Sequence, residues 1–325
     1  MPELPEVETI RRGLDKFVIH QKIQNTTILC DKSFHGTPTS AIITGIRRFG
    51  KALIIDLDNQ KSLMIHLRMT GQLIFDPKDK AARFAAGHPS ENFVDTLPNK
   101  QTRVIIELEN GTLYFNDQRK FGFIKVLDTK DLRDDPFIKK LAPEPWQMDE
   151  TVFYEKLQKH KNSPIKAVIL DQTVIAGLGN IYADEALFMS KIHPKTKAGT
   201  LTKKESANLL KMAAHAMDLS IESGGSTLRD YKKADGTRGD YLDKFAQVFN
   251  KQGKPCPICK TPIQKIRVAG RGTHICPHCQ TLRPASEIVS MCPAGHEDLA
   301  RAARSVPEGH AETTSDAKEK GTTND

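Results

Sequence analysis

The spacing of hydrophobic residues divides the chain into a helical start, an alternating middle and a second helical part. Val7, Ile10, Leu14 and Val18 recur at the interval of a helix and predict an amphipathic helix over residues 5–19. Pro5 fits the first turn of this helix because its fixed φ is already helical. The predicted helix therefore comes before any predicted strand.

From about residue 22 to residue 127 the hydrophobic period changes to two, which indicates strands. Many short strands separated by turn-rich pieces are typical of an antiparallel sandwich or barrel. The polar stretch 76–99 interrupts the pattern and predicts a long surface loop. The predicted strands are Lys22–Cys30, Ala41–Arg47, Ala52–Leu57, Leu63–Leu67, Gln72–Phe75, Val104–Glu109, Thr112–Asn116 and Phe123–Leu127.

After Pro143-Glu144-Pro145 the pattern becomes helical again. The predicted helices are Val152–Lys159, Pro164–Asp171, Asn180–Lys191 and Lys203–Glu222. Gly177-Leu178-Gly179 lies before the third of them. A Gly-x-Gly turn at a helix start lets backbone N–H groups approach a phosphate, although most such turns only join two helices. Strands followed by helices predict an α+β chain.

The charge distribution favours a polyanionic partner. The 325 residues carry a net charge of +8 and a pI near 9.1, while the stretch from residue 281 onward has five basic and eight acidic residues. A basic body with an acidic tail favours nucleic acid, with a merely soluble basic protein as the alternative. The tail lacks Phe, Trp and Tyr and is expected to be disordered. No apolar run is long enough to cross a membrane, so we expect a cytosolic protein.

Cysteine spacing predicts a structural zinc site. Cys256 and Cys259 form one C-x₂-C pair, and Cys276 and Cys279 form a second after sixteen residues. Such pairs make a four-thiolate tetrahedral site with no open coordination position. The sequence between them predicts a β-hairpin with residues 269–272 as its turn and cations near its tip. These cations favour phosphate contact over a purely structural role.

The first residues combine an amine with acids. Removal of Met1 would leave Pro2 with a free secondary amine, and Glu3, Glu6 and Glu8 follow closely. In such a pair the amine can act as a nucleophile and the neighbouring carboxylate as a general acid or base. By themselves, these residues favour a simple helix start whose acids face the positive end of the helix dipole.

Three motifs together resemble one family. Together they resemble bacterial formamidopyrimidine-DNA glycosylase. The motifs are Pro-Glu-Leu-Pro-Glu from residue 2, Gly-Leu-Gly-Asn-Ile-Tyr from residue 177 and Gly-Arg-Gly-Thr-His from residue 270, the last within the four-cysteine hairpin. The similarity covers about residues 2–280. It implies an antiparallel β-sandwich domain led by a helix over 1–142, a helix-two-turns-helix domain over 146–240 and a zinc-finger hairpin over 241–282. The tail, 283–325, has no counterpart in the family. The resemblance also implies a monomer, one structural zinc ion and double-stranded damaged DNA as partner.

The resemblance implies a bifunctional glycosylase and abasic-site lyase for oxidised purines. Pro2 matches the nucleophile and Glu3 the general acid or base. Lys51 matches a phosphate-contacting lysine with a proton-donor role, and Arg271 matches a residue of the δ-elimination step. A secondary amine that attacks C1′ expels the base and forms an iminium ion, which makes β- and δ-elimination feasible. The intact Pro2, Glu3 and Lys51 argue against a non-catalytic zinc-containing DNA-binding protein.

Other matches concern the DNA itself. The resemblance implies phosphate contacts for His66, Asn180, Lys265 and Arg271. It also implies that Met69, Arg119 and Phe121 fill the gap left by a flipped base, as apolar wedges do between base steps. By themselves Met69 and Phe121 would be ordinary core residues. Ser226 and Thr227 match a loop that closes over the base.

The chain also departs from the family pattern. Lys100-Gln101-Thr102-Arg103 replaces a usual Lys-His-x-His run, so that Gln101 could still donate to a phosphate but no imidazole is present. Phe249-Asn250 replaces a common Tyr-Gly. The alternative within the superfamily is an endonuclease VIII-like enzyme for oxidised pyrimidines. Leu4 argues against it, because that branch typically has glycine there.

Overall fold

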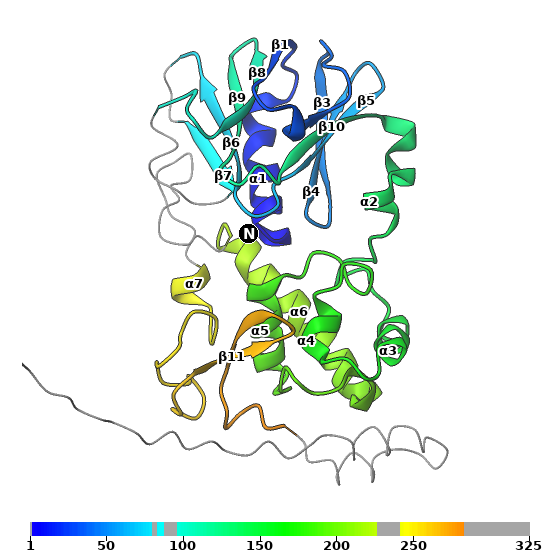
Figure 1. Cartoon of the computed structure of the whole chain (residues 1–325), viewed down its shortest axis with the longest axis vertical. Coiled ribbons are helices and arrows are strands. Elements are labelled where there is room, and N and C mark those ends of the chain that lie inside the picture. The colour runs from blue at the N-terminus through cyan, green and yellow to red at the C-terminus, as the bar shows by residue number, and fades with distance from the viewer. Residues whose placement is uncertain (1, 80–82, 88–95, 226–240, 283–325) are drawn as a thin grey trace, which may run out of the picture. The chain divides into compact units, whose positions relative to one another are not determined.

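The computed structural model describes residues 2–79, 83–87, 96–225 and 241–282, and Figure 1 shows the helices and strands that they form. The chain divides into two units, Met1–Leu282 and Arg283–Asp325, and every described residue belongs to the first. The predicted tail, together with Ser226 and Thr227, therefore lies outside the described residues.

Two five-stranded sheets form the first part of the fold (Figure 1). The first has the order β1-β8-β9-β6-β7 and is antiparallel throughout; the second has the order β2-β10-β5-β4-β3, in which only β2 is parallel to its neighbour. The strands are β1 (Ile23–Ile28), β2 (Phe34–His35), β3 (Ile43–Phe49), β4 (Ala52–Leu57), β5 (Lys61–His66), β6 (Gly71–Pro77), β7 (Phe84–Gly87), β8 (Thr102–Leu108), β9 (Gly111–Asp117) and β10 (Phe123–Asp128).

Helix α1 (Leu4–Val18) closes the sandwich between the edge strands β3 and β7. Its apolar side chains Val7, Ile10 and Leu14 lie in one core with residues from both sheets. Glu3 is the N-cap, and Glu3 N donates to Glu6 Oε2 at 2.7 Å as part of a capping box. Burial of this helical face therefore fixes the direction in which the chain's first residues point.

The sequence missed two strands of this sandwich. The stretch predicted as a loop, 76–99, contains β7, and the short β2 was not predicted at all. Phe84 holds β7 in place because its ring packs against the ring of Phe17 in α1, with centroids 5.8 Å apart. Gly13 makes this contact possible, since a Cβ there would lie 2.1 Å from the Phe84 ring. Because only small residues, Ala85, Ala86 and Gly87, follow Phe84 in this strand, a periodicity analysis did not detect it.

The helical part follows a short helix α2 (Pro136–Lys139) and packs around a second core. It contains α3 (Glu150–Lys159), α4 (Ile165–Ile169), α5 (Asn180–Met189), α6 (Lys203–Glu222) and α7 (Tyr241–Lys244). The α6 boundaries are those predicted, and Thr202 with Glu205 forms its capping box. Leu4 also belongs to this second core, so α1 contributes to both cores.

The last described element is a hairpin of β11 (Gln264–Val268) and β12 (Arg271–Ile275). Val268 pairs with Arg271, so the turn is Ala269-Gly270 and not the four residues 269–272 that the sequence predicted. Ala269 and Gly270 both have positive φ, which favours this tight two-residue turn. Within the described part of the chain, no helix is long and apolar enough to cross a membrane.

Candidate active site

The Glu3 carboxylate is buried at the N-terminus of α5. Glu3 is 2% exposed, and its Oε1 accepts a hydrogen bond from Ile181 N at 3.0 Å. Gly179 allows this approach, because a Cβ there would lie only 2.1 Å from Glu3 Cδ. Gly177 similarly admits Leu4, whose Cδ1 would lie 2.2 Å from an added Cβ. The Gly-x-Gly turn therefore packs against the chain's own first residues, which the sequence analysis did not anticipate.

Burial changes the protonation of Glu3. Loss of solvent raises the pKa of Glu3 to about 7, an effect that outweighs the opposing charge of Lys51. Glu3 Oε2 is buried and has no hydrogen-bond partner within the described part of the chain. A carboxyl group with a pKa near neutrality can both hold and release a proton, which suits a general acid or base.

Lys51 approaches the same turn from the sandwich. It lies between β3 and β4, is buried, and its Nζ donates to Leu178 O at 2.8 Å. Burial lowers the pKa of Lys51, with Glu3 and Glu6 acting in the opposite direction. Pro2 is also buried. Two residues further along the chain, Leu4 N donates to Gly177 O at 3.2 Å. The structure thus brings Glu3 and Lys51 to one turn and places Pro2 beside Glu3 in the chain.

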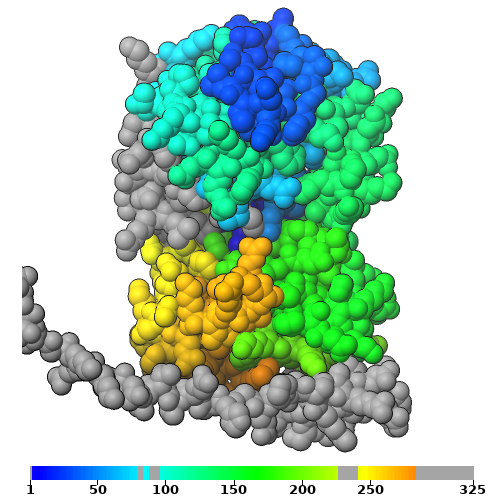
Figure 2. Space-filling model, in the orientation of Figure 1, coloured from blue at the N-terminus to red at the C-terminus, as the bar shows by residue number. Residues whose placement is uncertain are grey.

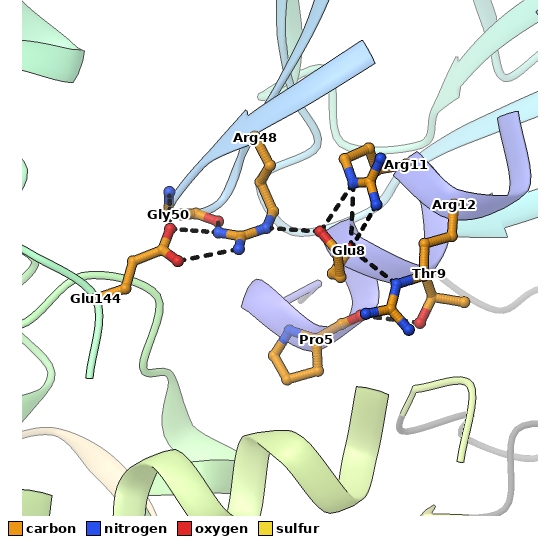
Figure 3. A network of polar contacts seen from close by, with 8 residues as sticks. All are labelled: Pro5, Glu8, Thr9, Arg11, Arg12, Arg48, Gly50 and Glu144. Atoms are coloured by element: carbon orange, nitrogen blue, oxygen red, sulfur yellow. Dashed lines mark hydrogen bonds and ion pairs between the residues drawn. The ribbon is translucent and has the colours of Figure 1, made fainter. Parts of the chain in front are cut away.

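A network of ion pairs holds the backbone next to Lys51 (Figure 3). Gly50 N donates to Glu144 Oε1 at 2.9 Å, and Gly50 O accepts from Arg48 at 3.0 Å. Arg48 also pairs with Glu144 and with Glu8 of α1, with 3.3 Å between Arg48 Nε and Glu8 Oε2. Burial alone would raise the pKa of Glu8, but hydrogen bonds from Arg11 and Arg12 lower it to about 2. The network connects α1, the β3–β4 turn and the segment before α3.

His66, at the end of β5, is buried and neutral. Burial, together with the charges of Arg68 and Lys51, lowers the pKa of His66 to about 3. Its Nδ1 accepts from Arg68 N at 3.0 Å, so the ring proton lies on Nε2. A neutral Nε2–H is a hydrogen-bond donor, which is what a phosphate contact requires.

The four cysteines predicted to bind zinc come together. Their Sγ atoms all lie within 4.8 Å of one another, with 3.9 Å between Cys256 and Cys279 and 3.4 Å between Cys259 and Cys276. A tetrahedral zinc ion with Zn–S bonds of about 2.3 Å needs sulfur atoms about 3.8 Å apart. The donor set and its spacing therefore fit a zinc ion, and Cys256 and Cys276 join a small apolar core with Phe188 and Val248.

A buried ion pair fixes the hairpin to the helical part. Lys166 of α4 and Asp184 of α5 are fully buried, with 2.6 Å between Nζ and Oδ1. Lys166 Nζ also donates to Thr273 Oγ1 at 2.7 Å and to Gly272 O at 3.2 Å. Asp184 Oδ2 accepts from the backbone N–H of His274 at 2.9 Å. The sequence analysis missed this pair, although isolated charges within apolar helices are a recognisable signal.

The hairpin that was predicted to carry cations forms part of the molecular surface (Figure 2, orange). Lys265 and Arg271 are exposed, and the Lys265 stem passes over Gly272, where a Cβ would lie 3.1 Å from Lys265 Cε. The charge of Arg271 helps to lower the pKa of both Lys51 and Lys166, after burial as the main cause. Asn180 Nδ2 donates to Gly272 O at 3.1 Å. Asn180 and the hairpin tip thus lie together beside the Glu3 turn.

The three predicted wedge residues lie on two loops of the sandwich. Met69 is half-buried between β5 and β6, while Arg119 and Phe121 are exposed between β9 and β10. Phe121 is 54% exposed, so it is not the core residue that its apolar side chain alone would suggest. The Arg119 guanidinium lies 4.8 Å from the Phe121 ring centroid. Gln101 is buried, and its side-chain oxygen accepts from Arg103 at 3.4 Å. Only its amide nitrogen is a donor and could bind a phosphate.

Comparison with known proteins decides the family. Family models match over residues 1–124 (formamidopyrimidine-DNA glycosylase N-terminal domain), 141–232 (formamidopyrimidine-DNA glycosylase H2TH domain) and 253–282 (zinc finger found in FPG and IleRS). A formamidopyrimidine-DNA glycosylase of Streptococcus pyogenes is 42% identical over 297 residues, covering 87% of this chain and 100% of that protein. The chain belongs to the formamidopyrimidine-DNA glycosylase family. A member from Desulfitobacterium hafniense is 35% identical, covering 86% of this chain and 100% of that protein.

Solved structures of this family agree with the fold. A Lactococcus lactis FPG mutant in complex with Fapy-dG-containing DNA is 36% identical with a TM-score of 0.76, covering 86% of this chain and all of that one. MutM in complex with carbocyclic 8-oxo-G-containing DNA is 36% identical with a TM-score of 0.75 over the same shares. The predicted fold class, with a β-sandwich, a helical region and a zinc-finger hairpin, is therefore confirmed.

Proposed function

We propose that this chain removes oxidised purines, such as 8-oxoguanine and formamidopyrimidines, from double-stranded DNA and then cleaves the DNA strand at the resulting abasic site. The observation that carries the proposal is the buried Glu3 carboxyl group, whose pKa is raised to about 7 and which follows Pro2 directly in the chain. Family membership supports it, since the solved relatives named above hold Fapy-dG and 8-oxo-G DNA.

The proposed nucleophile is the secondary amine of Pro2 after removal of Met1. An α-amino group has a pKa of about 8, so a substantial fraction is unprotonated at neutral pH. Its lone pair attacks C1′ of the damaged nucleotide, and the base departs with the electrons of its bond to C1′. The nitrogen then loses its proton, the C1′–O4′ bond breaks as the sugar ring opens, and the nitrogen and C1′ become an iminium ion. This cation acidifies the adjacent sugar C–H bond, so β-elimination and then δ-elimination release the two phosphates.

Glu3, Lys51 and Arg271 have supporting catalytic roles in this proposal. The protonated Glu3 carboxyl can donate its proton as the sugar ring opens, and the carboxylate can then accept one. Lys51, held at Leu178 O, offers an ammonium group for the phosphate near the lesion. Arg271 is exposed at the hairpin tip, where a guanidinium can bind a phosphate with two parallel hydrogen bonds during δ-elimination.

The proposed DNA contacts surround this centre. His66, Asn180 and Lys265 donate to phosphates, and Gln101 offers at most its amide nitrogen. Met69, Arg119 and Phe121 occupy the gap from which the damaged base is turned out. The exposed Phe121 supports this role, because an apolar side chain gains most from entering a stack when it begins in water.

Further parts of the proposal concern assembly. One zinc ion per chain, bound by Cys256, Cys259, Cys276 and Cys279, would fold the hairpin and take no part in bond breaking. We propose that the protein is a cytoplasmic monomer that associates with the bacterial nucleoid by binding DNA. The proposed functional divisions remain residues 1–142, 146–240 and 241–282, with 283–325 as a dispensable tail.

The proposal is tested by strand cleavage of matched duplexes. One carries a single 8-oxoguanine opposite cytosine, the second carries guanine there, and a third carries an oxidised pyrimidine. We expect cleavage of the first with products that bear phosphate at both ends of the gap, and none of the second. The third measures preference, because a wild-type Lactococcus lactis FPG structure contains oxidised-pyrimidine DNA. Faster cleavage of the pyrimidine duplex than of the 8-oxoguanine duplex would contradict the proposed substrate class.

A further inference from the structure

One buried carboxylate joins the two loops that carry the proposed wedge residues. Met69 lies between β5 and β6, and Arg119 and Phe121 lie between β9 and β10. Asp117 ends β9 and is completely buried. Neither the sequence motifs nor the proposed chemistry assigns Asp117 a task, yet a completely buried carboxylate is costly to keep unless it serves the fold or the reaction.

Asp117 accepts hydrogen bonds from both loops. Its Oδ2 accepts from Gly122 N at 2.6 Å and its Oδ1 from Arg119 N at 3.1 Å, so it holds both ends of the loop that contains Phe121. The Thr70 hydroxyl, from the residue after Met69, donates to the same Oδ1. A buried charge costs free energy unless donors surround it, and here the donors are the loops themselves.

Thr70 completes the connection. The Thr70 Oγ1 accepts a hydrogen bond from Arg119 N at 3.0 Å, and the same hydroxyl donates to Asp117. Thr70 therefore contacts Arg119 and Asp117 at once. The chain on the other side of Met69 is also held, because Arg68 N donates to His66 Nδ1 at 3.0 Å. Met69 therefore lies between two fixed residues.

The end of β9 is itself fixed by a residue that departs from the family pattern. Arg103 is buried, and its Nε donates to Asp117 O at 2.7 Å while NH1 donates to Lys100 O at 3.1 Å. Gly122 closes the loop tightly, since a Cβ there would lie 2.8 Å from the Phe115 ring and 3.0 Å from His66 O. The loop backbone is thus fixed, while Arg119 and Phe121 project from it.

We propose that Asp117 and Thr70 are positioning residues that make Met69, Arg119 and Phe121 enter the base stack as one unit. This inference rests on the proposed function. If the two loops were independent, each would have to be ordered during insertion, whereas a fixed pair of loops has already been ordered on folding. The Thr70–Asp117 connection should therefore matter for turning out a stacked base and matter little once no base is present.

The test compares Thr70→Val with Thr70→Ser and with the wild type. Valine keeps the shape but lacks the hydroxyl, while serine keeps the hydroxyl. Single-turnover rates are measured on a duplex with 8-oxoguanine opposite cytosine and on one with an abasic site opposite cytosine. We expect Thr70→Val to lose about tenfold on 8-oxoguanine, the effect of one lost hydrogen bond to a buried charge. Its abasic-site rate should stay within about twofold, and Thr70→Ser should restore the first rate.

A 2-aminopurine beside the lesion gives a second measurement, because its fluorescence rises when the neighbouring stack opens. We expect this rise to slow in Thr70→Val in parallel with 8-oxoguanine excision. Equal losses on both duplexes, or an unchanged 8-oxoguanine rate, would overturn the inference while leaving the proposed function intact. A wild-type protein that cleaves neither duplex would overturn the proposed function and this inference with it.

Discussion

The buried centre at Glu3 and the exposed tip of the zinc hairpin use charge in opposite ways. Glu3 and Lys51 are buried at the turn before α5, and both have pKa values shifted towards neutrality by loss of solvent. Lys265 and Arg271 are exposed on the hairpin. Proton transfer needs a pKa near the working pH, whereas the long-range attraction to DNA comes from permanent charges that the DNA can reach.

The two regions also differ in what holds them. The Glu3 carboxylate lies where Gly179 has no side chain, and it accepts a hydrogen bond from Ile181 N. The hairpin is held by four cysteines and by the buried Lys166–Asp184 pair. Small changes near Glu3 should therefore affect chemistry, whereas damage to the hairpin should affect DNA affinity.

Gly179→Ala should produce the largest effect. A Cβ there would lie 2.1 Å from Glu3 Cδ, so Glu3 must leave the α5 N-terminus. General acid or base catalysis contributes about 10²–10⁴, and we expect a loss on the order of 10³ in the single-turnover rate on 8-oxoguanine duplex. The control is Gly45→Ala, where an added Cβ meets nothing within 4 Å. Near-normal activity of Gly179→Ala would show that the position of Glu3 is unimportant.

Cys256→Ser should weaken DNA binding through loss of the zinc site. Loss of one thiolate removes the zinc site, and with it the ordered presentation of Lys265 and Arg271. Two lost charge-assisted phosphate bonds correspond to a rise in Kd for abasic-site duplex of about 100-fold. Zinc content and Kd are measured on the same sample, with Cys30→Ser as the matched control. A zinc-free variant with unchanged Kd would contradict the hairpin's role.

The smallest of these effects should be on stability: Glu3→Gln should change how the free energy of unfolding depends on pH, because it removes the carboxyl group whose pKa is raised. The folded-state pKa of Glu3, about 7, lies above the ordinary value of 4.5, so the folded protein binds this proton more tightly than the unfolded chain. The stability of the wild type relative to Glu3→Gln should be greatest below pH 4.5. It should fall as the pH rises through 7, by up to about 3 kcal/mol. Denaturant unfolding of both proteins at several pH values measures this, and a pH-independent difference would show that burial does not raise the pKa of Glu3.

The sequence was informative where a repeated pattern reported a buried face. The helix after Pro2, strand β4 and helix α6 agree with prediction because their apolar residues recur over many positions. The four zinc ligands were found from spacing alone, since two C-x₂-C pairs within one short stretch are typical of a four-thiolate zinc site. Motifs, and not periodicity, led to Pro2, Lys51 and the wedge residues.

Contacts between distant residues could not be predicted. Strand β7 depends on Phe84 meeting Gly13, and the buried carboxylate of Glu3 depends on Gly179, far away in sequence. Lys166 pairs with Asp184 and reaches Thr273 of the hairpin. Asp117 directly follows a predicted strand, and the sequence gives no sign that it holds Thr70 and Gly122. Each depends on packing that a single sequence does not encode locally.

The central claim is that the Pro2 amine attacks the sugar, and covalent trapping tests it most directly. The protein is mixed with duplex containing 8-oxoguanine opposite cytosine in the presence of borohydride, which reduces an iminium ion to a stable amine. The adduct is then digested and its DNA-bearing peptide identified by mass spectrometry. We predict one adduct, on the peptide that begins with Pro2, and its loss when Met1 is retained. An adduct on a lysine such as Lys51, or excision with no adduct, would contradict the claim.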